Sequence, residues 1–524
     1  MKTVGKMNAK VNGNVERKLM LIDGEWTASA GGEFIPVETP AKKGTIIAEV
    51  PRAMEADVDR SVKAAAKAFE SWKRMSPRDR GKLMLKIAAD MEAQSENLAK
   101  TLSLETGNAI RTQSRGEIAL AADLFRFYGG VASEQKGETV PLGEQVLCYS
   151  RREPVGVVAG IIPWNSPILL GALKITMALT PGNTLILKPA SDAPLAVLKM
   201  ARICNAHLPR GVLNVVTGSG NECGTMLARH SGVRKLSLTG SSEVGKSIMA
   251  AAAERIVPVT LELGGKSPQI VFPDADDDHV VQSVINGMRF TRQGQSCTAG
   301  SRLFLHASIF DSFIDKLVKK LSTLKIGDPL DEATDIGAII NRMQFKKVCD
   351  YVKDGLEQKG SRLVMGGLPP KAGPLAQGYF MEPTIFTHIK NEWRIAREEV
   401  FGPVLVSIPW EDEEEAIRMA NDSHYGLAAY VYSHDIGKAL RTAHVIESGW
   451  IQVNQGLGIL PGTSYGGFKQ SGMGREYSLE GMLDKLYAAQ VHHREPSVLT
   501  LQVHSPRCCK RSPGRVTFKS LQRL

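Results

Sequence analysis

The sequence predicts an α/β protein, and two patterns along its 524 residues lead to this class. After Pro154, short runs rich in β-branched residues alternate with spacers of about 20 residues, which is long enough for a crossover helix. Nearly continuous apolar strands of this kind are typical of a parallel sheet that helices cover on both faces. Before that point, residues 54–101 carry apolar side chains near a 3.6-residue period, which predicts helices.

Two α/β regions follow one another in the chain. A helix is expected over 116–127, ahead of the first region, and another over 307–324 in the second. In the first region we expect strands at 157–162, 184–187, 212–216, 235–238 and 258–261. The second region begins near residue 267, with strands expected at 270–272, 302–306, 401–408, 428–432 and 450–453.

The net charge of +10 is concentrated at the C-terminal end. Residues 493–524 hold seven of the 65 basic residues and one of the 55 acidic residues, so the rest of the chain is nearly balanced. A balanced body gives no electrostatic argument for nucleic-acid binding. With 43% hydrophobic and 23% charged residues, the composition excludes a mainly disordered or fibrous protein.

The seven cysteines are odd in number and scattered, with no CxxC pair. This spacing predicts neither a disulfide framework nor a zinc site, so we expect no metal and a cytoplasmic location. The N-terminus lacks the apolar run of a signal peptide. The most apolar stretch, 156–179, is interrupted by proline, asparagine and lysine, and we interpret it as a buried segment rather than a membrane span.

Cys297 lies among small residues, in the segment 294–300. An isolated cysteine is usually a small buried apolar residue. Small neighbours, however, allow a ligand to reach the sulfur and leave backbone N–H groups for an oxyanion, and a thiolate is a strong nucleophile toward a carbonyl carbon. Cys297 is therefore a candidate nucleophile.

Three polar features follow predicted strands. Glu262 ends the strand 258–261, at the sheet edge where α/β proteins place functional groups, although a paired or exposed acid is the alternative. Asn165 is an amide inside an apolar segment and could instead satisfy a turn. The segment 240–245 pairs two glycines with a following helix, which suits a phosphate, or forms only a turn with a capping serine.

Taken together, these motifs resemble the NAD(P)-dependent aldehyde dehydrogenase superfamily. The resemblance runs from Leu21 to about Leu486 and keeps the family's order. The matching segments are Pro163-Trp164-Asn165, Lys188-Pro189-Ala190-Ser191, Gly240 to Gly245, Leu261-Glu262-Leu263-Gly264-Gly265, Gly294-Gln295-Ser296-Cys297 and Glu399-Val400-Phe401-Gly402-Pro403.

The resemblance implies a reaction for three of these residues. Cys297 would attack an aldehyde to give a thiohemiacetal, and the Asn165 amide with the Cys297 N–H would hold the oxyanion. Hydride transfer to the nicotinamide would leave a thioester, which water activated by Glu262 would hydrolyse to a carboxylic acid.

The resemblance also implies sites for NAD or NADP. Lys188 would hold the adenosine ribose and Glu399 the nicotinamide ribose. The full expected set is Ile162, Pro163, Trp164, Lys188, Ser191, Gly240, Ser241, Gly245, Leu263, Glu399 and Phe401. Strongly NAD-selective relatives often have glutamate where Ser191 stands here, so we expect NADP to be tolerated, although Asp192 could restore some repulsion.

The positions that match the family's aldehyde tunnel carry few aromatic rings here. They are Ser166, Leu170, Leu173, Thr291, Ile459 and Tyr465. We therefore expect bulky or medium-chain apolar aldehydes. Arg292 offers an alternative, pairing with the acidic tail of a semialdehyde, unless it is a surface or supporting arginine.

The resemblance further implies two doubly wound α/β domains, one Rossmann-like for the cofactor and one catalytic, with a small β oligomerisation arm. We assign the cofactor domain to 1–138 and 157–267, the catalytic domain to 268–480 and the arm to 139–156 and 481–492. A homodimer or homotetramer is expected. We interpret 493–524 as a basic, disordered tail, with an arm for anionic membranes or nucleic acid as the alternative. A non-catalytic structural relative is the alternative to an enzyme.

Overall fold

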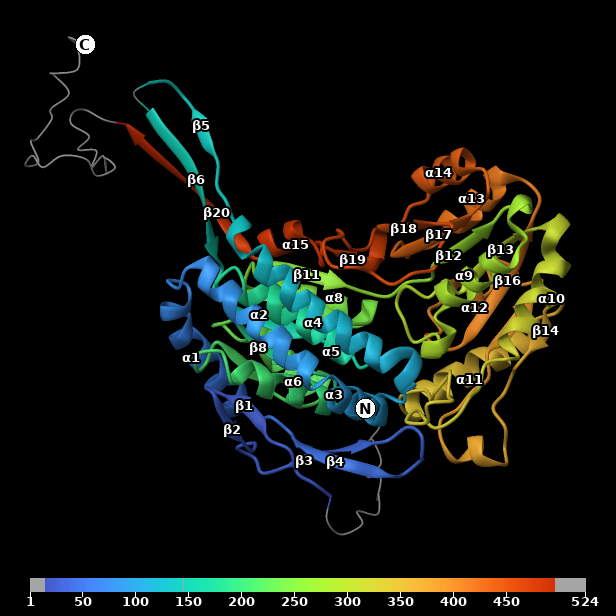
Figure 1. The fold of residues 1–524 in the computed structure, drawn as a ribbon, viewed down its shortest axis with the longest axis horizontal. Helices are drawn as coiled ribbons and strands as arrows, with labels where there is room; N and C mark the ends of the chain where they lie inside the picture. Colours follow the sequence, from blue (N-terminus) through green and yellow to red (C-terminus); the bar gives the residue numbers. More distant parts are fainter. Residues whose placement is uncertain (1–14, 145, 495–524) are drawn as a thin grey trace, which may run out of the picture.

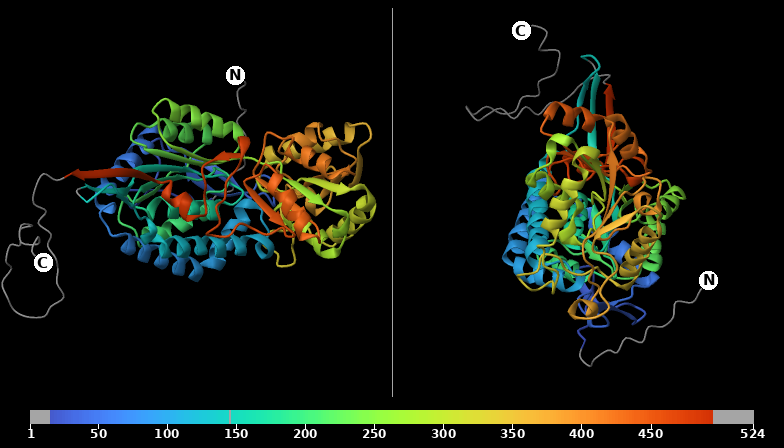
Figure 2. Two further views of the ribbon diagram at one scale, coloured as in Figure 1. Left: turned by 90° about the horizontal axis from the view of Figure 1, so that it is seen from above. Right: turned by 90° about the vertical axis from the view of Figure 1, so that its right-hand side faces the viewer.

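The computed structural model describes residues 15–144 and 146–494 and contains two large sheets that lie side by side, each with its own helices (Figures 1 and 2). The first sheet has eight strands in the order β19-β11-β10-β7-β8-β9-β1-β2. Their bounds are β1 (Met20–Ile22), β2 (Glu25–Thr27), β7 (Val157–Ile161), β8 (Thr184–Lys188), β9 (Leu213–Val215), β10 (Lys235–Thr239), β11 (Val259–Glu262) and β19 (Gly472–Met473).

The five central strands of this sheet, β7 to β11, are parallel, and the chain winds away from β7 in both directions. From β7 it passes to β8 and β9 on one side, then returns to β10 and β11 on the other. The switch point therefore lies between the carboxyl ends of β7 and β10, where such sheets open a crevice.

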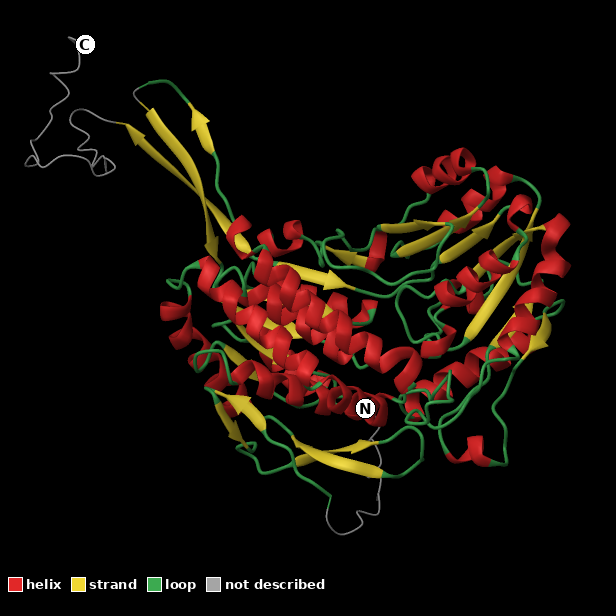
Figure 3. Cartoon of the chain, in the orientation of Figure 1, coloured by secondary structure: helices red, strands yellow, loops and turns green. Residues whose placement is uncertain are grey.

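Helices cover both faces of the first sheet (Figure 3). Along β7, Val157 and Ala159 pack in the core beneath α1, α7 and α8, whereas Val158 packs on the opposite face beneath α2 to α6. Side chains of a strand alternate between faces, so a strand buried on both sides must be apolar throughout. The helices are α1 (Glu55–Trp72), α2 (Pro77–Ala93), α3 (Ser95–Thr106), α4 (Arg115–Gly130), α5 (Pro167–Leu179), α6 (Leu195–Asn205), α7 (Thr225–Arg229) and α8 (Ser242–Ala253).

The second sheet has seven strands in the order β14-β15-β16-β13-β12-β17-β18, and it too is buried on both faces. Its strands are β12 (Pro268–Val271), β13 (Arg302–His306), β14 (Arg362–Met365), β15 (Thr384–Thr387), β16 (Val404–Trp410), β17 (Ala428–Tyr432) and β18 (Trp450–Val453). The helices around it are α9 (Asp278–Met288), α10 (Phe310–Leu321), α11 (Arg342–Glu357), α12 (Arg394–Arg397), α13 (Glu413–Asn421) and α14 (Ile436–Val445).

Two small sheets complete the described chain. A three-stranded sheet projects from the body and joins β5 (Thr139–Pro141), β6 (Val146–Pro154) and β20 (Leu486–Arg494), the last of which follows α15 (Leu479–Leu483) (Figure 1). The segments 139–156 and 481–492 are therefore paired with each other, and β20 extends two residues into the segment we assigned to the tail. A hairpin joins β3 (Phe34–Glu38) and β4 (Ile46–Pro51).

Some elements differ from those expected. The strand expected at 401–408 begins at Val404, because Pro403 has no N–H for the ladder and Phe401 has a left-handed φ of 56°. The helical stretch 54–101 is broken into three helices, and Ser76 caps the second one, which starts at Pro77. Strand β19, inside the segment 268–480, pairs with β11 of the first sheet.

Candidate active site

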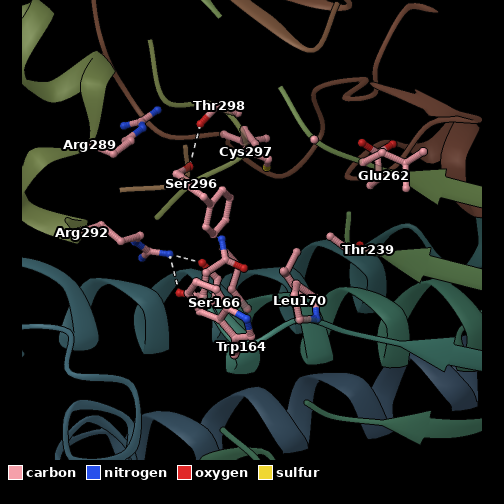
Figure 4. A pocket seen from close by; sticks show the side chains of 18 of the residues that line it. Trp164, Ser166, Leu170, Thr239, Glu262, Arg289, Arg292, Ser296, Cys297 and Thr298 are labelled. Atoms are coloured by element: carbon pink, nitrogen blue, oxygen red, sulfur yellow. Dashed lines mark hydrogen bonds between the residues drawn. The ribbon is translucent and has the colours of Figure 1, made fainter. Parts of the chain in front are cut away.

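The expected site residues converge where β7, β10 and β11 end. A cavity of about 390 Å³ opens there, between the first sheet and the loops of the second (Figure 4). Fourteen of the expected residues line it: Pro163, Trp164, Asn165, Ser166, Leu170, Gly240, Ser241, Glu262, Leu263, Cys297, Glu399, Phe401, Ile459 and Tyr465. They come from six separate stretches of the chain.

The loop that carries Cys297 is held in a strained shape. Two non-glycine residues before the cysteine, Arg289 and Gln293, have left-handed φ values of 60° and 52°. Gln295 fixes the turn, since its amide nitrogen donates to Gln293 Oε1 at 3.0 Å and its Oε1 accepts from the Ile340 N–H at 3.0 Å. The loop therefore presents a half-buried Cys297 side chain to the cavity.

Two sequential glycines bring the cysteine loop against the end of β11. A Cβ on Gly265 would lie 2.3 Å from the Cys297 carbonyl oxygen, and one on Gly264 would lie 2.8 Å from a carboxylate oxygen of Glu399. Gly265 thus permits the close approach of backbone to backbone, whereas Gly264 leaves space for the Glu399 carboxylate.

Glu262 is buried, with 4% of its surface exposed, and neither carboxylate oxygen has a hydrogen-bond partner in the described chain. Burial raises its pKa well above 4.5, and the nearby carboxylate of Glu476 adds to the rise. Glu476 itself accepts from Lys174 Nζ at 2.6 Å and from Ser237 Oγ at 3.3 Å. A carboxylate without partners and with a raised pKa suits a proton acceptor.

Asn165 is held from both its ends. Its side-chain Nδ2 donates to the Gln295 carbonyl at 3.0 Å, which leaves the second N–H of the amide free to point elsewhere. Its backbone carbonyl accepts from Arg292 Nη1 at 3.3 Å. An amide fixed in this way is pre-organised to meet a developing oxyanion.

Arg292 is a supporting arginine rather than a surface one. Its guanidinium donates to the Ser166 hydroxyl (Figure 4). It also donates to Gln113 Oε1 at 3.0 Å and to Glu117 Oε2 at 3.2 Å. Glu117 is buried and also accepts from the Ile168 N–H at 3.2 Å, at the start of α5. Burial raises the pKa of Glu117, whereas Arg292 and the backbone N–H groups oppose the rise.

The cysteine thiol meets a tyrosine hydroxyl in the cavity. Cys297 Sγ lies 3.6 Å from Tyr465 Oη. Burial raises the pKa of the Cys297 thiol to about 11, although the Tyr465 hydroxyl lowers it. The thiol therefore requires help to ionise near neutral pH.

Several groups remain available for a nicotinamide dinucleotide. Lys188 is buried, and its ammonium donates to the Pro189 carbonyl at 2.9 Å, which leaves two donors. Glu399 uses one oxygen to accept from the Gly265 N–H at 2.9 Å. The first turn of α8 offers backbone N–H groups, since Ser241 Oγ accepts only from Val244 N–H. These donors and acceptors match the ribose hydroxyls and pyrophosphate of such a group.

Four of the expected cofactor residues lie outside the cavity lining. Ile162 is buried and donates its N–H to the Lys188 carbonyl at 3.1 Å. Gly245 faces Leu263, because a Cβ there would come within 2.6 Å of that side chain, so its glycine serves helix packing. Lys188 ends β8, which pairs with β7, and Ser191 follows three residues later.

Two of the expected aldehyde residues also lie outside the cavity. Leu173 is fully buried in the core beneath α5, and Thr291 Oγ1 instead accepts from Gln113 at 2.7 Å. The lining also contains Arg292, the candidate partner for a semialdehyde, and residues we did not expect, namely Gln113, Leu120, Leu169, Thr239, Gly264, Arg289, Ser296, Thr298, Gln344, Lys347, Gly458, Glu476 and Tyr477. Of these, Leu120 and Leu169 extend the aliphatic wall.

No helix within residues 15–144 and 146–494 has both the length and the apolar character needed to cross a membrane. Within the same residues, no group of three or more histidine, cysteine or acidic side chains could hold a metal ion.

Known proteins similar to this chain are aldehyde dehydrogenases. Residues 26–491 match the aldehyde dehydrogenase family model. The chain is 40% identical over 462 residues to DhaS of Bacillus subtilis (strain 168), across 88% of this chain and 92% of DhaS. It is also 40% identical over 466 residues to the hydroxyisobutyraldehyde dehydrogenase of Mycolicibacterium austroafricanum, across 88% of this chain and 91% of that protein.

A crystal structure of an aldehyde dehydrogenase has the same fold. The NAD-dependent aldehyde dehydrogenase from Sinorhizobium meliloti superposes with a TM-score of 0.89 at 37% identity, across 92% of this chain and 96% of that chain. The predicted α/β fold class and the resemblance seen in the motifs are both confirmed.

Proposed function

Because this chain belongs to the aldehyde dehydrogenase family, we propose that it oxidises an aldehyde to a carboxylic acid with NAD(P)+ through a thioester on Cys297. The observation that carries this proposal is the convergence of Cys297, Asn165 and Glu262 on one cavity. A nucleophile, an amide donor and a carboxylate without partners are the groups that acyl chemistry requires.

In the first half-reaction, the Cys297 thiolate attacks the aldehyde carbon. The free N–H of the Asn165 amide and the backbone N–H of Cys297 then stabilise the alkoxide. Since Asn165 is already held by Gln295 and Arg292, little reorganisation is needed as the charge develops.

When bound, NAD(P)+ would supply the hydride acceptor, and Cys297 would then hold the acyl group as a thioester. Lys188 and Glu399 would hold its two riboses, and the first turn of α8 its pyrophosphate. The rings of Trp164 and Phe401, whose centroids lie 5.3 Å apart in an edge-on arrangement, would wall its nicotinamide end.

In the second half-reaction, Glu262 takes a proton from water as the water attacks the thioester. Its raised pKa supports this role, because a carboxylate with a pKa nearer neutrality is a stronger base than an ordinary one. The thiolate leaves, and the carboxylic acid is released.

For the substrate we propose bulky or medium-chain apolar aldehydes. Leu120, Leu169, Leu170 and Ile459 form an aliphatic wall around the cavity. Aromatic cages favour cationic aldehydes, whereas these four side chains are aliphatic and the aromatic lining residues Tyr465 and Tyr477 lie apart from them in the sequence. The hydroxyisobutyraldehyde dehydrogenase among the relatives acts on a branched aliphatic aldehyde, which agrees with such a wall.

A semialdehyde is the second candidate, and Arg289 favours it. Its guanidinium lines the cavity and donates to the Gly456 and Leu457 carbonyls, without an acidic partner in the described chain. Arg292 is less suited to a substrate carboxylate, because Glu117 already pairs with it.

The test is a panel of aldehydes, with NAD+ and NADP+, monitored by the absorbance of the reduced cofactor. We expect the highest kcat/KM with neutral aliphatic aldehydes of intermediate size. A highest value with an acidic aldehyde would favour the semialdehyde, and one with a small or cationic aldehyde would contradict the apolar tunnel. Turnover at the wild-type rate by Cys297→Ala would overturn the proposed mechanism.

For the cofactor we propose that NADP+ is accepted beside NAD+. Ser191 removes the acidic side chain that would repel a 2′-phosphate, and Asp192 is engaged by Asn341 Nδ2 at 2.9 Å. A preference for NAD+ above about 100-fold in kcat/KM, or roughly 2.7 kcal/mol, would contradict this.

We further propose a homodimer or homotetramer in the cytoplasm, with the sheet of β5, β6 and β20 as the pairing arm. Exposed apolar side chains on this sheet, Leu147 and Tyr487, support this role. The tail was expected over residues 493–524. Residues 493 and 494 belong to β20, and residues 495–524 lie outside the described chain. Size measured by light scattering, with and without residues 495–524, tests both points.

A further inference from the structure

The ring of Tyr465 fills space in the wall of the cavity, but its hydroxyl is not required for that packing and has a separate role. The ring is buried, with 4% of the residue exposed, and packs edge-on against Trp450 and Tyr477, with centroids 6.0 and 5.7 Å away. Phenylalanine would fill this space equally well. A buried hydroxyl is costly unless it is hydrogen-bonded, so its partner identifies its purpose.

That partner is the nucleophile. Cys297 Sγ, 3.6 Å away, is the hydrogen-bond partner of Tyr465 Oη among the described residues. A hydroxyl and a thiol can each donate to the other, but a thiolate can only accept. The bond is therefore stronger after the thiol proton has left, since one partner is then charged.

We propose that the Tyr465 hydroxyl donates a hydrogen bond to the Cys297 thiolate and is thereby a catalytic residue rather than only a part of the aldehyde wall. This inference rests on the proposed role of Cys297 and adds a second group to it. Burial disfavours the Cys297 thiolate most, and the nearby carboxylates of Glu399 and Glu262 add to this effect, so a hydrogen-bond donor at the sulfur opposes both.

The burial of Tyr465 and Tyr477 agrees with this assignment. Burial raises the pKa of Tyr465 well above 10, and the neighbouring Cys297 and Glu262 contribute to the rise, so the phenol keeps its proton. Tyr477 also keeps its proton, because burial raises its pKa well above 10. Tyr465 therefore stays a donor at every pH at which the enzyme would work.

The test follows the ionisation of Cys297 itself, without aldehyde or cofactor. The full-length wild-type protein and Tyr465→Phe are alkylated with iodoacetamide across a pH range, and the modified cysteine is identified by peptide mass. We expect the titration midpoint of Cys297 to rise by about one pH unit in the variant, with alkylation about tenfold slower below the midpoint.

Tyr477→Phe is the matched control, since it removes a tyrosine hydroxyl from the same cavity but no bond to Cys297 Sγ. We expect its midpoint to stay at the wild-type value. An unchanged midpoint in Tyr465→Phe, or an equal shift in both variants, would overturn the proposal.

A second variant protects the test if Tyr465→Phe fails to fold. Replacing Tyr465 by 3,5-difluorotyrosine keeps the ring and makes the hydroxyl a stronger donor, so the midpoint should fall. A midpoint that rises or stays unchanged would contradict the bond. Because these measurements involve no turnover, they stand apart from the test of the proposed reaction.

Discussion

The two ends of the cavity, marked by Arg292 and Glu262 in Figure 4, differ in how a buried carboxylate is held. Behind the lining at the Arg292 end, Glu117 accepts from backbone N–H groups of α5 and from Arg292. At the other end, Glu262 accepts from nothing in the described chain. Both acids are buried and both have a raised pKa.

The difference indicates which acid positions its neighbours and which acid is free to react. A carboxylate with a complete set of donors is held rigid and transmits that rigidity to its partners, here α5 and the loop of Asn165. A carboxylate with none is strained by desolvation and binds a proton readily. Hydrogen-bond count thus separates the positioning acid from the reacting acid.

Removing the reacting acid should have the largest effect. Glu262→Gln keeps the shape but not the base, so we expect steady-state turnover to fall by about 10²–10⁴-fold. The first turnover should survive as a burst of reduced cofactor, because acylation does not require Glu262. A lost burst, measured by stopped flow, would assign Glu262 to the first step instead.

Removing the charge of the positioning acid should mainly affect stability. Glu117→Gln leaves Arg292 without its counter-charge, and we expect the free energy of unfolding to fall by about 3 kcal/mol in chemical denaturation. The double variant with Arg292→Gln should recover part of the loss. If Glu117→Gln slowed turnover as much as Glu262→Gln without destabilising the fold, the proposed division between the two ends would be wrong.

The raised pKa of Glu262 also predicts opposing pH trends for stability and for turnover. The folded protein holds the proton of Glu262 more tightly than the unfolded chain, so this group's contribution to stability is lost as pH rises above about 4.5. Its slope reaches about 1.4 kcal/mol per pH unit at most. Turnover should rise over the same interval, because the base must be ionised. In Glu262→Gln, the free energy of unfolding should depend less steeply on pH over this interval. A slope equal to that of the wild-type protein would contradict the raised pKa of Glu262.

A change in the wall between the two ends should have the smallest effect. Leu170→Phe narrows the tunnel without touching either acid, and we expect KM for a bulky aldehyde to rise about tenfold while kcat changes little. An equal rise in KM for a two-carbon aldehyde would show that Leu170 does more than shape the tunnel.

Local motifs were sufficient to predict that Cys297 and Glu262 line one cavity. Cys297 stands among small residues and Glu262 shortly before a glycine pair, and Gly265 of that pair lies close to the Cys297 backbone. The strands were predictable for a similar reason, since burial on both faces makes them apolar throughout.

The supporting residues were not predictable, because their partners are distant in the chain. Glu117 and Arg292 are 175 residues apart, and nothing near either one indicates the pair. On α5, apolar residues occupy every side of the helix, so the sequence could not show that Leu169 faces the cavity and Leu173 the core. Only the packing of the helix separates them.

The contact between Gly265 and the Cys297 carbonyl has a consequence for how this protein can change over evolution. It fixes the nucleophile's loop to the strand of the base through main chain alone, independently of the side chains that surround the aldehyde. Substitutions around the tunnel can therefore alter which compounds are consumed while the reacting pair keeps its geometry. New specificities can arise by exchange of a few wall residues, with the chemistry inherited intact.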